Sequence, residues 1–530
     1  MELLIEGLWG RRPILLQALV AGATLVVAFW LRLRWNRRHK SEWPPGPPTI
    51  PILAHLHLLG ELPHQSLAKL AKRYGPLLGL RLGGVRTIVA SSPLMAKEIL
   101  QTNDMVFAYR PRFAAAVHMY FNCADMGFAP YGPMWRFMRQ LCATELFNAK
   151  RLSSCRNVRE EESRDISRAV LEIGKKGKEP VELRAMLLAA SNNITCRMCM
   201  GKKFGEISSI KKGSEGERQD LLSLVEELMR LLAVFYIGDF IPWLWWLDPY
   251  GYLRQMKATG RKARSFMQEI IDHRRQELNG RAAQHSGPED MLDVLIAAAD
   301  DPTAEFRISD ENIMGLILDL FAGGSDTSSV TVEWALADLI NNQEAMVKLQ
   351  AELDAVVGKS RLVTESDVEN LPYLSCVLKE SMRLHPSVPL LLPHESVEAC
   401  QIGGYRIPAK TRAYVNTWAI GRDPSVWERP LEFWPERFDG NNLDLRGKQF
   451  ELLPFGSGRR GCPGWSLGVL NVQIMLATLV QGFTWSICSP SSPPQGTQQT
   501  IDMSERFGLA VNMDKPLIVY ATPRLPLSLY

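Results

Sequence analysis

One cysteine of this chain lies in a glycine-rich segment that could prepare its sulfur to bind a metal. Cys462 belongs to the sequence PFGSGRRGCPG, residues 454–464. The glycines permit tight backbone bends around the sulfur, and Pro463 suits the start of a following helix. Because N–H groups and the positive end of a helix lower the pKa of a thiol, we expect a thiolate here. Haem iron is the natural partner, since a proximal thiolate favours O–O cleavage and Arg460 can pair with a propionate. The alternative is a buried free cysteine in a turn.

The segment resembles the cysteine loop of the cytochrome P-450 superfamily. That pattern is Phe, two residues, Gly, any residue, Arg, any residue, Cys, any residue, Gly, and it is filled here by Phe455, Gly458, Arg460, Cys462 and Gly464. Further family motifs follow in family order from Pro44 to near the C-terminus, so the resemblance covers nearly the whole chain. It implies haem b (iron protoporphyrin IX) as cofactor, with Cys462 as the axial ligand of the iron and with Phe455 and Gly456 among the haem-binding residues.

A second group of residues could activate dioxygen. Ser309 is an N-cap signal, and the apolar pattern after it predicts a long helix through Ile313 to about Ile340. Its middle reads FAGGSDTS, residues 321–328. Two glycines inside a helix cost about 1 kcal/mol each relative to alanine, so we expect Gly323 and Gly324 to leave room for dioxygen. The alternative is a helix that packs closely through its glycines.

The polar residues after these glycines suit proton delivery. We expect Thr327 to hydrogen-bond the carbonyl four residues earlier and to open the helix locally. Asp326 supplies an acid, and a relay of carboxyl, hydroxyl and water can deliver the two protons that O–O cleavage requires. The segment resembles the oxygen-activation motif of the family, which implies that Asp326 and Thr327 are catalytic.

Two further motifs are expected around the haem. Glu380 and Arg383 are three residues apart and share a helix face, and the resemblance implies that Arg437 of the segment PERF completes a structural network behind the haem. Trp135 and Arg139 are four residues apart and present two donors on one face, which suits a propionate. The family has lysine after that arginine, where this chain has Gln140. None of the nine histidines sits in a loop like that of Cys462, and His385 is expected to pack.

The chain has no flavin or nicotinamide motif, so its electrons must come from a partner. The resemblance implies NADPH-cytochrome reductase, with a cytochrome b-type protein as a further donor and O2 as co-substrate. We expect the docking surface to include Arg136, Lys150, Arg151 and Arg459, with solvated charges as the alternative.

The N-terminus predicts a membrane anchor. Residues 13–31 contain no charged side chain and as a helix would extend ~28 Å, close to the thickness of the hydrocarbon core. Five basic residues between positions 32 and 40 follow the span and outnumber Arg11 and Arg12, which predicts a cytosolic body. A proline-rich hinge follows. The predicted organisation is an anchor at residues 1–40, a hinge at 41–50 and one catalytic domain at 51–530, and the resemblance implies the endoplasmic reticulum membrane.

The rest of the chain predicts a mainly α fold with small β-sheets. Glycine pairs predict two hairpins, Leu77–Leu82 with Val85–Ala90 and Gln401–Ile402 with Tyr405–Ile407, and residues 412–418 predict a strand. Periodicity predicts long helices at 160–173, 219–232, 256–278 and 343–357, with surface loops at 211–217, 279–289 and 489–500. A net charge of +4 gives no support for nucleic-acid binding, and nine cysteines without framework spacing predict mostly free thiols, Cys196 and Cys199 included.

The segment Phe240–Leu247 contains three tryptophans and is too short to span a bilayer. Core packing is one interpretation. The other is that the segment dips into the membrane interface beside a substrate entrance, because tryptophan favours that layer.

The substrate is expected to be apolar or aromatic. The resemblance is to the plant A-type group, many of whose members hydroxylate phenylpropanoids or flavonoids, while others oxidise terpenoids. It places substrate-contact regions at 113–128, 317–321, 387–393 and 507–509, which are mostly apolar, and His118, Asn122 or Ser325 could orient the ligand. Two other classes stay open: a haem-thiolate isomerase or dehydratase that needs no O2, and a non-catalytic haem-binding scaffold. The intact pair Asp326 and Thr327 argues against both.

Overall fold

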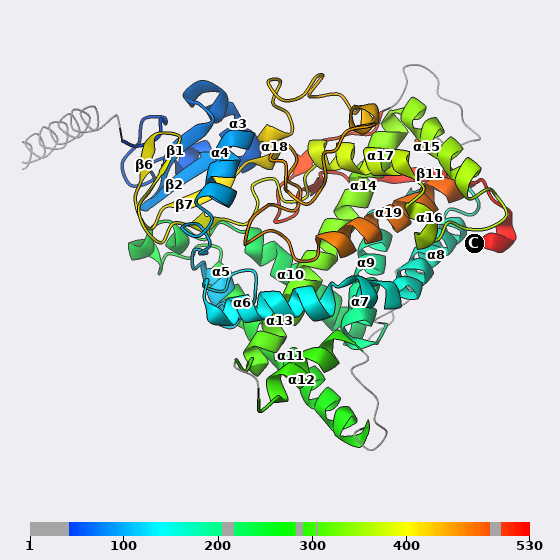
Figure 1. Ribbon diagram of the computed structural model, residues 1–530, viewed down its shortest axis with the longest axis horizontal. Coiled ribbons are helices and arrows are strands. Elements are labelled where there is room, and N and C mark those ends of the chain that lie inside the picture. Colours follow the sequence, from blue (N-terminus) through cyan, green and yellow to red (C-terminus); the bar gives the residue numbers. More distant parts are fainter. Residues whose placement is uncertain (1–41, 204–216, 282–289, 304–305, 488–499) are drawn as a thin grey trace, which may run out of the picture.

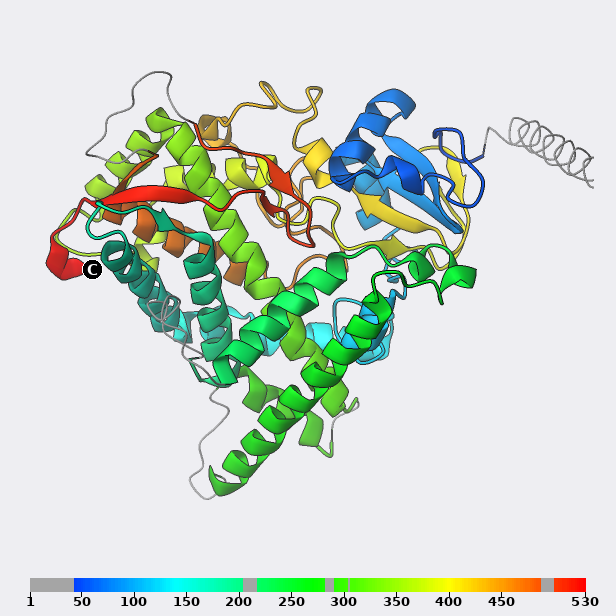
Figure 2. The ribbon, with the colours of Figure 1, turned by 180° about the vertical axis from the view of Figure 1, so that it is seen from behind.

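The computed structural model describes residues 42–203, 217–281, 290–303, 306–487 and 500–530 (Figure 1). The predicted anchor and the three predicted surface loops lie wholly or mainly outside these residues. Helices form most of the described body, and a sheet lobe lies to one side of it (Figures 1 and 2). This confirms the expectation of a mainly α fold. The eight cysteines of the described residues are all free, as their spacing predicted.

The sheet lobe is built around the first predicted hairpin. β1 (Leu77–Leu82) pairs antiparallel with β2 (Val85–Ala90), β2 runs parallel to β7 (Arg412–Val415), and β4 (His394–Glu395) completes the order β1-β2-β7-β4. β1 is buried at five of its six positions, as expected for a strand covered on both faces. The second hairpin, β5 (Cys400–Ile402) with β6 (Tyr405–Ile407), is also confirmed.

The strand predicted for residues 412–418 is too long. β7 ends at Val415, and the side chain of Asn416 accepts a hydrogen bond from Ala419 N to begin α18 (Thr417–Ile420). An asparagine N-cap therefore overrides the β-branched pattern that continues after it.

Strands from the C-terminal part of the chain form two small sheets in the helical body. β11 (Ile518–Pro523) pairs with both β3 (Val181–Glu182) and β8 (Phe483–Ser486), and β9 (Glu505–Arg506) pairs with β10 (Asn512–Met513). These strands bring the C-terminal end of the chain against α8 (Arg156–Ile173) and α9 (Arg184–Met200), two helices from the first half of the sequence.

Three helices cross the centre of the molecule. α13 (Asp310–Gly324) begins at Ser309, as predicted, and α14 (Asp326–Asn341) continues its course, while α19 (Trp465–Gly482) packs against α14. The predicted helix is therefore present, and Ser325, with φ −91° and ψ −65°, separates α13 from α14 at the point where a local opening was expected. Of the described helices, α19 alone is long and apolar enough to cross a membrane, and it is 67% buried within the body, as a core helix would be.

The other predicted long helices are present with slightly different ends. They are α8, α10 (Glu217–Ala233), α11 (Tyr252–Arg281) and α15 (Gln343–Val356). The remaining helices are α3 (Pro63–Tyr74), α4 (Pro93–Lys97), α5 (Ala114–Met119), α6 (Pro133–Leu141), α7 (Ala149–Ser154), α12 (Met291–Asp300), α16 (Glu365–Val368) and α17 (Pro372–Leu384).

Two predicted surface features lie beside the sheet. In the proline-rich segment, Pro45 O accepts a hydrogen bond of 2.8 Å from Gly79 N, so this segment packs on β1. The tryptophan segment contacts the hairpin through Phe240 O, which accepts from Gly84 N at 2.7 Å. Its three tryptophans are 61–65% exposed. Core packing of this segment is therefore wrong for the tryptophans, and the membrane interpretation stays a prediction.

Candidate functional site: a cysteine-lined internal cavity

Backbone hydrogen bonds hold Cys462 in a folded-back loop directly before α19. Cys462 N donates to Phe455 O at 2.9 Å, and Gly461 N donates to Gly458 O at 3.1 Å. Gly458 has φ 70°, and a Cβ on it would lie 2.0 Å from Leu100 O, so only glycine fits there. The helix begins at Trp465, as Pro463 indicated.

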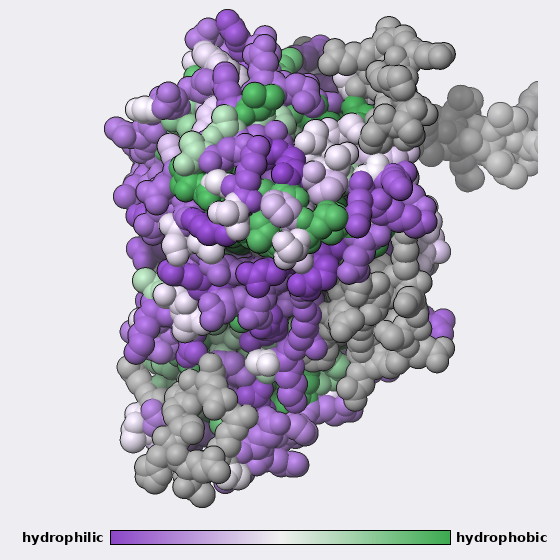
Figure 3. All heavy atoms as spheres, turned by 90° about the vertical axis from the view of Figure 1, so that its right-hand side faces the viewer, coloured by the Kyte–Doolittle hydropathy of each residue, from purple (hydrophilic) through white to green (hydrophobic). Residues whose placement is uncertain are grey.

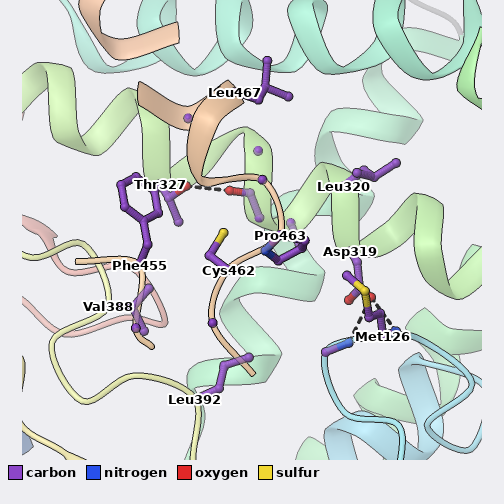
Figure 4. A pocket seen from close by; sticks show the side chains of 18 of the residues that line it. Met126, Asp319, Leu320, Thr327, Val388, Leu392, Phe455, Cys462, Pro463 and Leu467 are labelled. Atoms are coloured by element: carbon purple, nitrogen blue, oxygen red, sulfur yellow. Dashed lines mark hydrogen bonds between the residues drawn. The ribbon is translucent and has the colours of Figure 1, made fainter. Parts of the chain in front are cut away.

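The sulfur of Cys462 opens into an internal cavity, with Phe455 and Pro463 on either side of it (Figure 4). Burial raises the pKa of Cys462 more than the Gly464 N–H and the Arg139 guanidinium lower it. The loop therefore lowers the pKa of the thiol, as expected, but burial has the larger effect. A metal cation deprotonates a thiol that coordinates it, so the thiolate depends on the bound metal and not on the loop alone.

The cavity has a volume of about 320 Å³ and a mostly apolar wall. It is bounded by the cysteine loop, by the junction of α13 and α14, by α6 and by the segment 387–392. Its apolar side chains include Leu316, Leu320, Val388, Leu391, Leu392, Leu467 and Leu509. Such a wall fits a flat apolar group together with an apolar ligand.

The junction of α13 and α14 faces this cavity with a hydroxyl group. Thr327 Oγ1 donates to Gly323 O at 2.6 Å, which is the predicted bond to the carbonyl four residues earlier. A Cβ on Gly323 would meet no atom within 4 Å, whereas one on Gly324 would lie 3.0 Å from Thr195 Oγ1 of α9. Gly323 thus leaves open space in the cavity wall, while Gly324 serves the close helix packing that was the alternative.

Asp326 lies beside the cavity and is not among its lining residues, whereas Thr327 is. Burial raises the pKa of Asp326 to about 6, against the opposing effect of Arg184. The structure therefore places the carboxyl behind the wall that carries the hydroxyl. A proton from Asp326 would need an intervening group, such as water, to reach the cavity.

Cationic side chains gather at one edge of the cavity. Trp135, Arg139 and Arg460 line it, as predicted, together with Arg110 and His394, which sequence analysis did not select. Arg460 donates to three carbonyl groups, including Met126 O at 3.1 Å, and Trp135 Nε1 donates to Met126 O at 3.0 Å. Arg139 makes no hydrogen bond with the described residues, and burial lowers the pKa of its guanidinium group.

Arg110 and His394 could not be recognised from a motif. Arg110 donates from Nη1 to Leu392 O at 2.7 Å and to Pro393 O at 2.9 Å, and burial lowers the pKa of His394 well below its ordinary value. Tyr109, which precedes Arg110, forms a β-bridge with Glu395 of β4, so the two residues come together from distant parts of the sequence. Only the three-dimensional pairing brings them to this edge.

The predicted network around Glu380 is assembled. Arg383 donates from Nε to Glu380 Oε2 and from Nη2 to Glu380 Oε1, each at 2.7 Å, and Arg437 Nε donates to Glu380 Oε1 at 3.0 Å. Glu380 is fully buried. Arg383 also donates to Pro430 O at 2.7 Å. The network ties α17 to the segment that leads toward the cysteine loop, and its role in retaining the haem stays a prediction.

The predicted substrate-contact regions contribute to the cavity only in part. The lining residues from these regions include Tyr120, Phe128, Leu320, Ser387, Val388, Leu391, Leu392 and Leu509. His118 and Asn122 instead line a separate outer depression with Lys257 and Arg261, because α5 and the loop after it turn them away from the cavity. Ser325 is fully buried between α13 and α14, outside the lining. The expectation that these three orient the ligand is therefore wrong.

An unexpected pair of carboxylates lies at the cavity edge. Asp319 of α13 lines the cavity near Met126 (Figure 4), and the fully buried Asp125 interacts with it. The available signal was an acidic residue inside the apolar run Leu316–Phe321. A buried charge in such a run requires a partner, although the sequence could not say which.

The basic residues expected to dock a partner divide into two sets. Arg136 and Arg459 both contact Tyr131, each with its guanidinium carbon 5.9 Å from the ring centre, and Arg459 also pairs with Asp104 at 2.8 Å. Lys150 and Arg151 lie on α7. Docking by these residues stays a prediction.

The residues around Cys462 fit a haem. The described residues contain no group of three or more His, Cys, Asp or Glu that could hold a metal ion, so a single sulfur ligand suits a metal that brings its other ligands with it. The open space at Gly323 and the apolar wall accept a porphyrin ring. The side chains of Arg139, Arg460 and Arg110 suit its propionates.

Comparisons with known proteins agree with this geometry. The family model "Cytochrome P450" matches residues 44–509. The chain is 40% identical over 96% of its length to a flavonoid 3'-monooxygenase of Petunia hybrida, of which it covers 97%, and 41% identical over 94% of its length to a flavonoid 3'-monooxygenase of Arabidopsis thaliana, of which it covers 94%. A zebra fish cytochrome P450 solved with progesterone is similar with TM-score 0.71 and 26% identity, over 87% of this chain and 99% of that one.

Proposed function

The chain belongs to the cytochrome P450 family, and from this premise we propose that it hydroxylates a flavonoid or a related phenylpropanoid. It is a haem-thiolate monooxygenase, which uses O2 and electrons that a redox partner delivers from NADPH. The single observation that carries the proposal is the exposure of the Cys462 sulfur in an apolar cavity below Gly323 and Thr327. The relatives named flavonoid 3'-monooxygenase support the substrate class.

The positions of Cys462, the cationic side chains and Thr327 at the cavity each support a specific role. Bound haem would supply the reductive activation of O2 and the insertion of one oxygen atom. Cys462 would ligate its iron, while Arg139, Arg460 and Arg110 would neutralise its propionates. The Thr327 hydroxyl donates to Gly323 O and offers its lone pairs to a water molecule in the cavity.

Asp326 supplies protons from behind this wall. Because its pKa is raised to about 6, a small fraction of the carboxyl is protonated near neutral pH and can be replenished from solvent. Transfer to the Thr327 hydroxyl would pass through water.

The apolar wall orients the substrate. Leu320 and Leu316 of α13 face the segment that carries Val388 and Leu392 across the cavity. A flat aromatic ring fits between such walls, with few hydrogen bonds to direct it. A terpenoid also satisfies an apolar wall, and terpenoid oxidation is therefore an outcome that the experiment below must distinguish.

The organisation of the whole chain follows from the same premise. We propose a membrane anchor in residues 1–40 and a catalytic body that faces the cytosol at the endoplasmic reticulum. NADPH-cytochrome reductase is the proposed partner, and the exposed Arg136 and Arg459 are part of its proposed docking surface. A cationic surface steers an acidic partner toward it.

The test uses membranes that contain the full-length chain and a plant NADPH-cytochrome reductase. Separate pools of flavanones and flavones, cinnamic acids, and mono- and sesquiterpenes are incubated with and without NADPH, and products are identified by mass spectrometry. The expected result is an NADPH-dependent flavonoid product that is heavier by one oxygen atom. A product from the terpene pool alone would overturn the substrate class, and a product that forms equally without NADPH would favour an isomerase.

A further inference from the structure

Two carboxyl groups meet inside the wall of the cavity. Asp319 belongs to α13, and Asp125 belongs to the loop between α5 and α6 and is fully buried. A Cβ placed on Gly127 would lie 3.1 Å from Asp125 Oδ2 and 3.2 Å from Asp319 Oδ1. The two carboxyl groups therefore border the same small space.

Backbone N–H groups use one oxygen of each carboxyl. Asp319 Oδ2 accepts from Met126 N at 2.7 Å and from Gly127 N at 3.1 Å, and Asp125 Oδ2 accepts from Phe128 N at 2.7 Å. Asp125 Oδ1 is buried and finds no donor among the described residues. An acceptor left unpaired in the interior is costly, and a proton between the two carboxyl groups would give it a partner.

The electrostatics around the pair also require a proton. Burial raises the pKa of Asp125 well above its ordinary value and that of Asp319 to about 7, although the N–H groups of Met126 and Gly127 oppose the second shift. Two adjacent buried carboxylates cannot both ionise at neutral pH. The charged and titratable groups that face the pair are Arg110, Tyr120, Cys123, Cys142 and Arg460. The guanidinium groups of Arg110 and Arg460 stabilise the one negative charge that the pair keeps.

The loop that the pair fixes carries the carbonyl groups that hold the cationic edge of the cavity. Met126 O accepts from both Trp135 and Arg460, Ala129 O accepts from Arg460 Nη2 at 2.5 Å, and Gly127 O accepts from Arg110 Nε at 3.3 Å. The N–H side of the loop thus rests on the two carboxyl groups, and its C=O side holds Arg460, Trp135 and Arg110.

We propose that Asp125 and Asp319 share one proton and act as a positioning pair, which holds the 125–129 loop so that its carbonyl groups orient Arg460, Trp135 and Arg110 toward the haem edge. The pair links the oxygen-activating helix α13 to the haem-binding side chains. It acts through the loop and not on the reacting atoms.

Asparagine substitutions test the shared proton in the full-length holoprotein. Asp125→Asn keeps the acceptor for Phe128 N and turns an amide donor toward Asp319, so it fixes the proton in place. Asp319→Asn does the same in the opposite direction. In the double variant two amide donors face each other, and the pair loses its negative charge. We therefore expect each single variant to bind haem as the wild type does and the double variant to lose haem to apomyoglobin at least about tenfold faster, which is about 1.4 kcal/mol.

Two readouts separate this pair from an ordinary structural contact. A raised pKa in the folded state means that the stability contributed by the proton is lost as pH rises from 3.8 toward about 7. Over the upper part of this window the unfolding midpoint of the wild type should fall by roughly 2–4 °C relative to Asp125→Asn. Infrared difference spectra of the wild type against Asp125→Asn should contain the C=O stretch of a protonated carboxyl that persists at neutral pH.

Two results would overturn the proposal. The first is a double variant whose haem loss equals the product of the single effects, because the side chains would then not be coupled. The second is the absence of a protonated carboxyl band together with parallel pH profiles for the wild type and Asp125→Asn. Asp125→Leu serves as the matched disruptive control and should lose haem faster than Asp125→Asn. None of these measurements needs a substrate, so they remain informative if the flavonoid assignment fails.

Discussion

Thr327 holds a carbonyl group that an uninterrupted helix would have bonded through its own backbone. Its hydroxyl donates to Gly323 O at 2.6 Å while Ser325 separates α13 from α14. One side chain therefore stabilises the local opening and also places a hydroxyl group in the cavity wall. The same atom serves the fold and the chemistry.

Thr327→Ala should uncouple electron use from product formation. NADPH consumption should continue, while the product formed per NADPH should fall by at least about tenfold, because the hydroxyl that relays protons at the cavity is lost. Thr327→Ser keeps the hydroxyl and should retain most of the coupling. The measurement is a parallel assay of NADPH, hydrogen peroxide and hydroxylated product. Equal coupling in the alanine variant and the wild type would contradict the role.

Asp326→Asn should stabilise the protein at neutral pH while it slows turnover. The pKa of Asp326 is raised to about 6 from 3.8, so the folded state loses stability as pH rises through this window, and asparagine removes that loss. We expect a gain of about 1–3 kcal/mol near pH 7 and none at low pH. Denaturant unfolding of both proteins as a function of pH gives the comparison. A loss of stability at neutral pH would show that ionised Asp326 has a favourable partner.

Local patterns in the sequence predicted much of the site at the level of single elements. The N-cap at Ser309, the bond from Thr327 and the helix start after Pro463 depend on neighbouring residues and are confirmed. The local opening of the helix at Ser325 was also expected, whereas the helix that follows the N-cap Asn416 was missed, because the asparagine side chain competes with the surrounding apolar period.

Contacts between distant elements were beyond the sequence. His118 and Asn122 fell within an expected contact region, but α5 turns them outward. Arg110, Asp125 and Asp319 became recognisable only when α13 and the sheet brought their segments together. The sequence also could not show that burial by the rest of the molecule exceeds the effect of the loop on the pKa of Cys462.

The network between α17 and the segment 428–437 should control haem retention. Glu380→Gln leaves Arg383 and Arg437 buried without their carboxylate, which costs about 3–5 kcal/mol. We expect a lower unfolding midpoint and faster loss of haem, with little change of product identity in the protein that remains loaded. Glu352→Gln, on α15, is a useful control because Glu352 bonds the N–H groups of Tyr373 and Leu374 at the start of α17 and lies outside the network. Similar haem loss in both variants would indicate a general effect on α17.

The surface of the whole molecule is uneven in its exposure of apolar side chains. On the side where the C-terminus lies, hydrophilic residues predominate and apolar ones form small patches (Figure 3). Beside the sheet, by contrast, the side chains of Trp243, Trp245 and Trp246 are more than half exposed. They follow Phe240, whose carbonyl group contacts the turn between β1 and β2. Exposed tryptophans of this kind favour the membrane interface.

A chain without residues 1–41 should keep a weaker affinity for membranes. Replacing the three tryptophans with serine in this truncated chain should reduce its binding to phospholipid vesicles by at least about tenfold, because three aromatic side chains are then no longer buried in the interface. Serine substitution of the exposed Leu431 and Val347 provides a control of similar apolar loss elsewhere. Vesicle flotation measures the bound fraction. Equal flotation of the tryptophan variant and its parent would exclude the membrane interpretation.

The fate of the oxygen atoms of O2 tests most directly whether this chain is a monooxygenase. The purified full-length chain is combined with reductase, NADPH, a flavonoid substrate and isotopically labelled O2, and Cys462→Ser is assayed in parallel. We expect one labelled oxygen atom per product molecule from the wild type, and no product from Cys462→Ser. Wild-type product that carries no label, or that forms without NADPH, would contradict a monooxygenase in which Cys462 binds the haem iron.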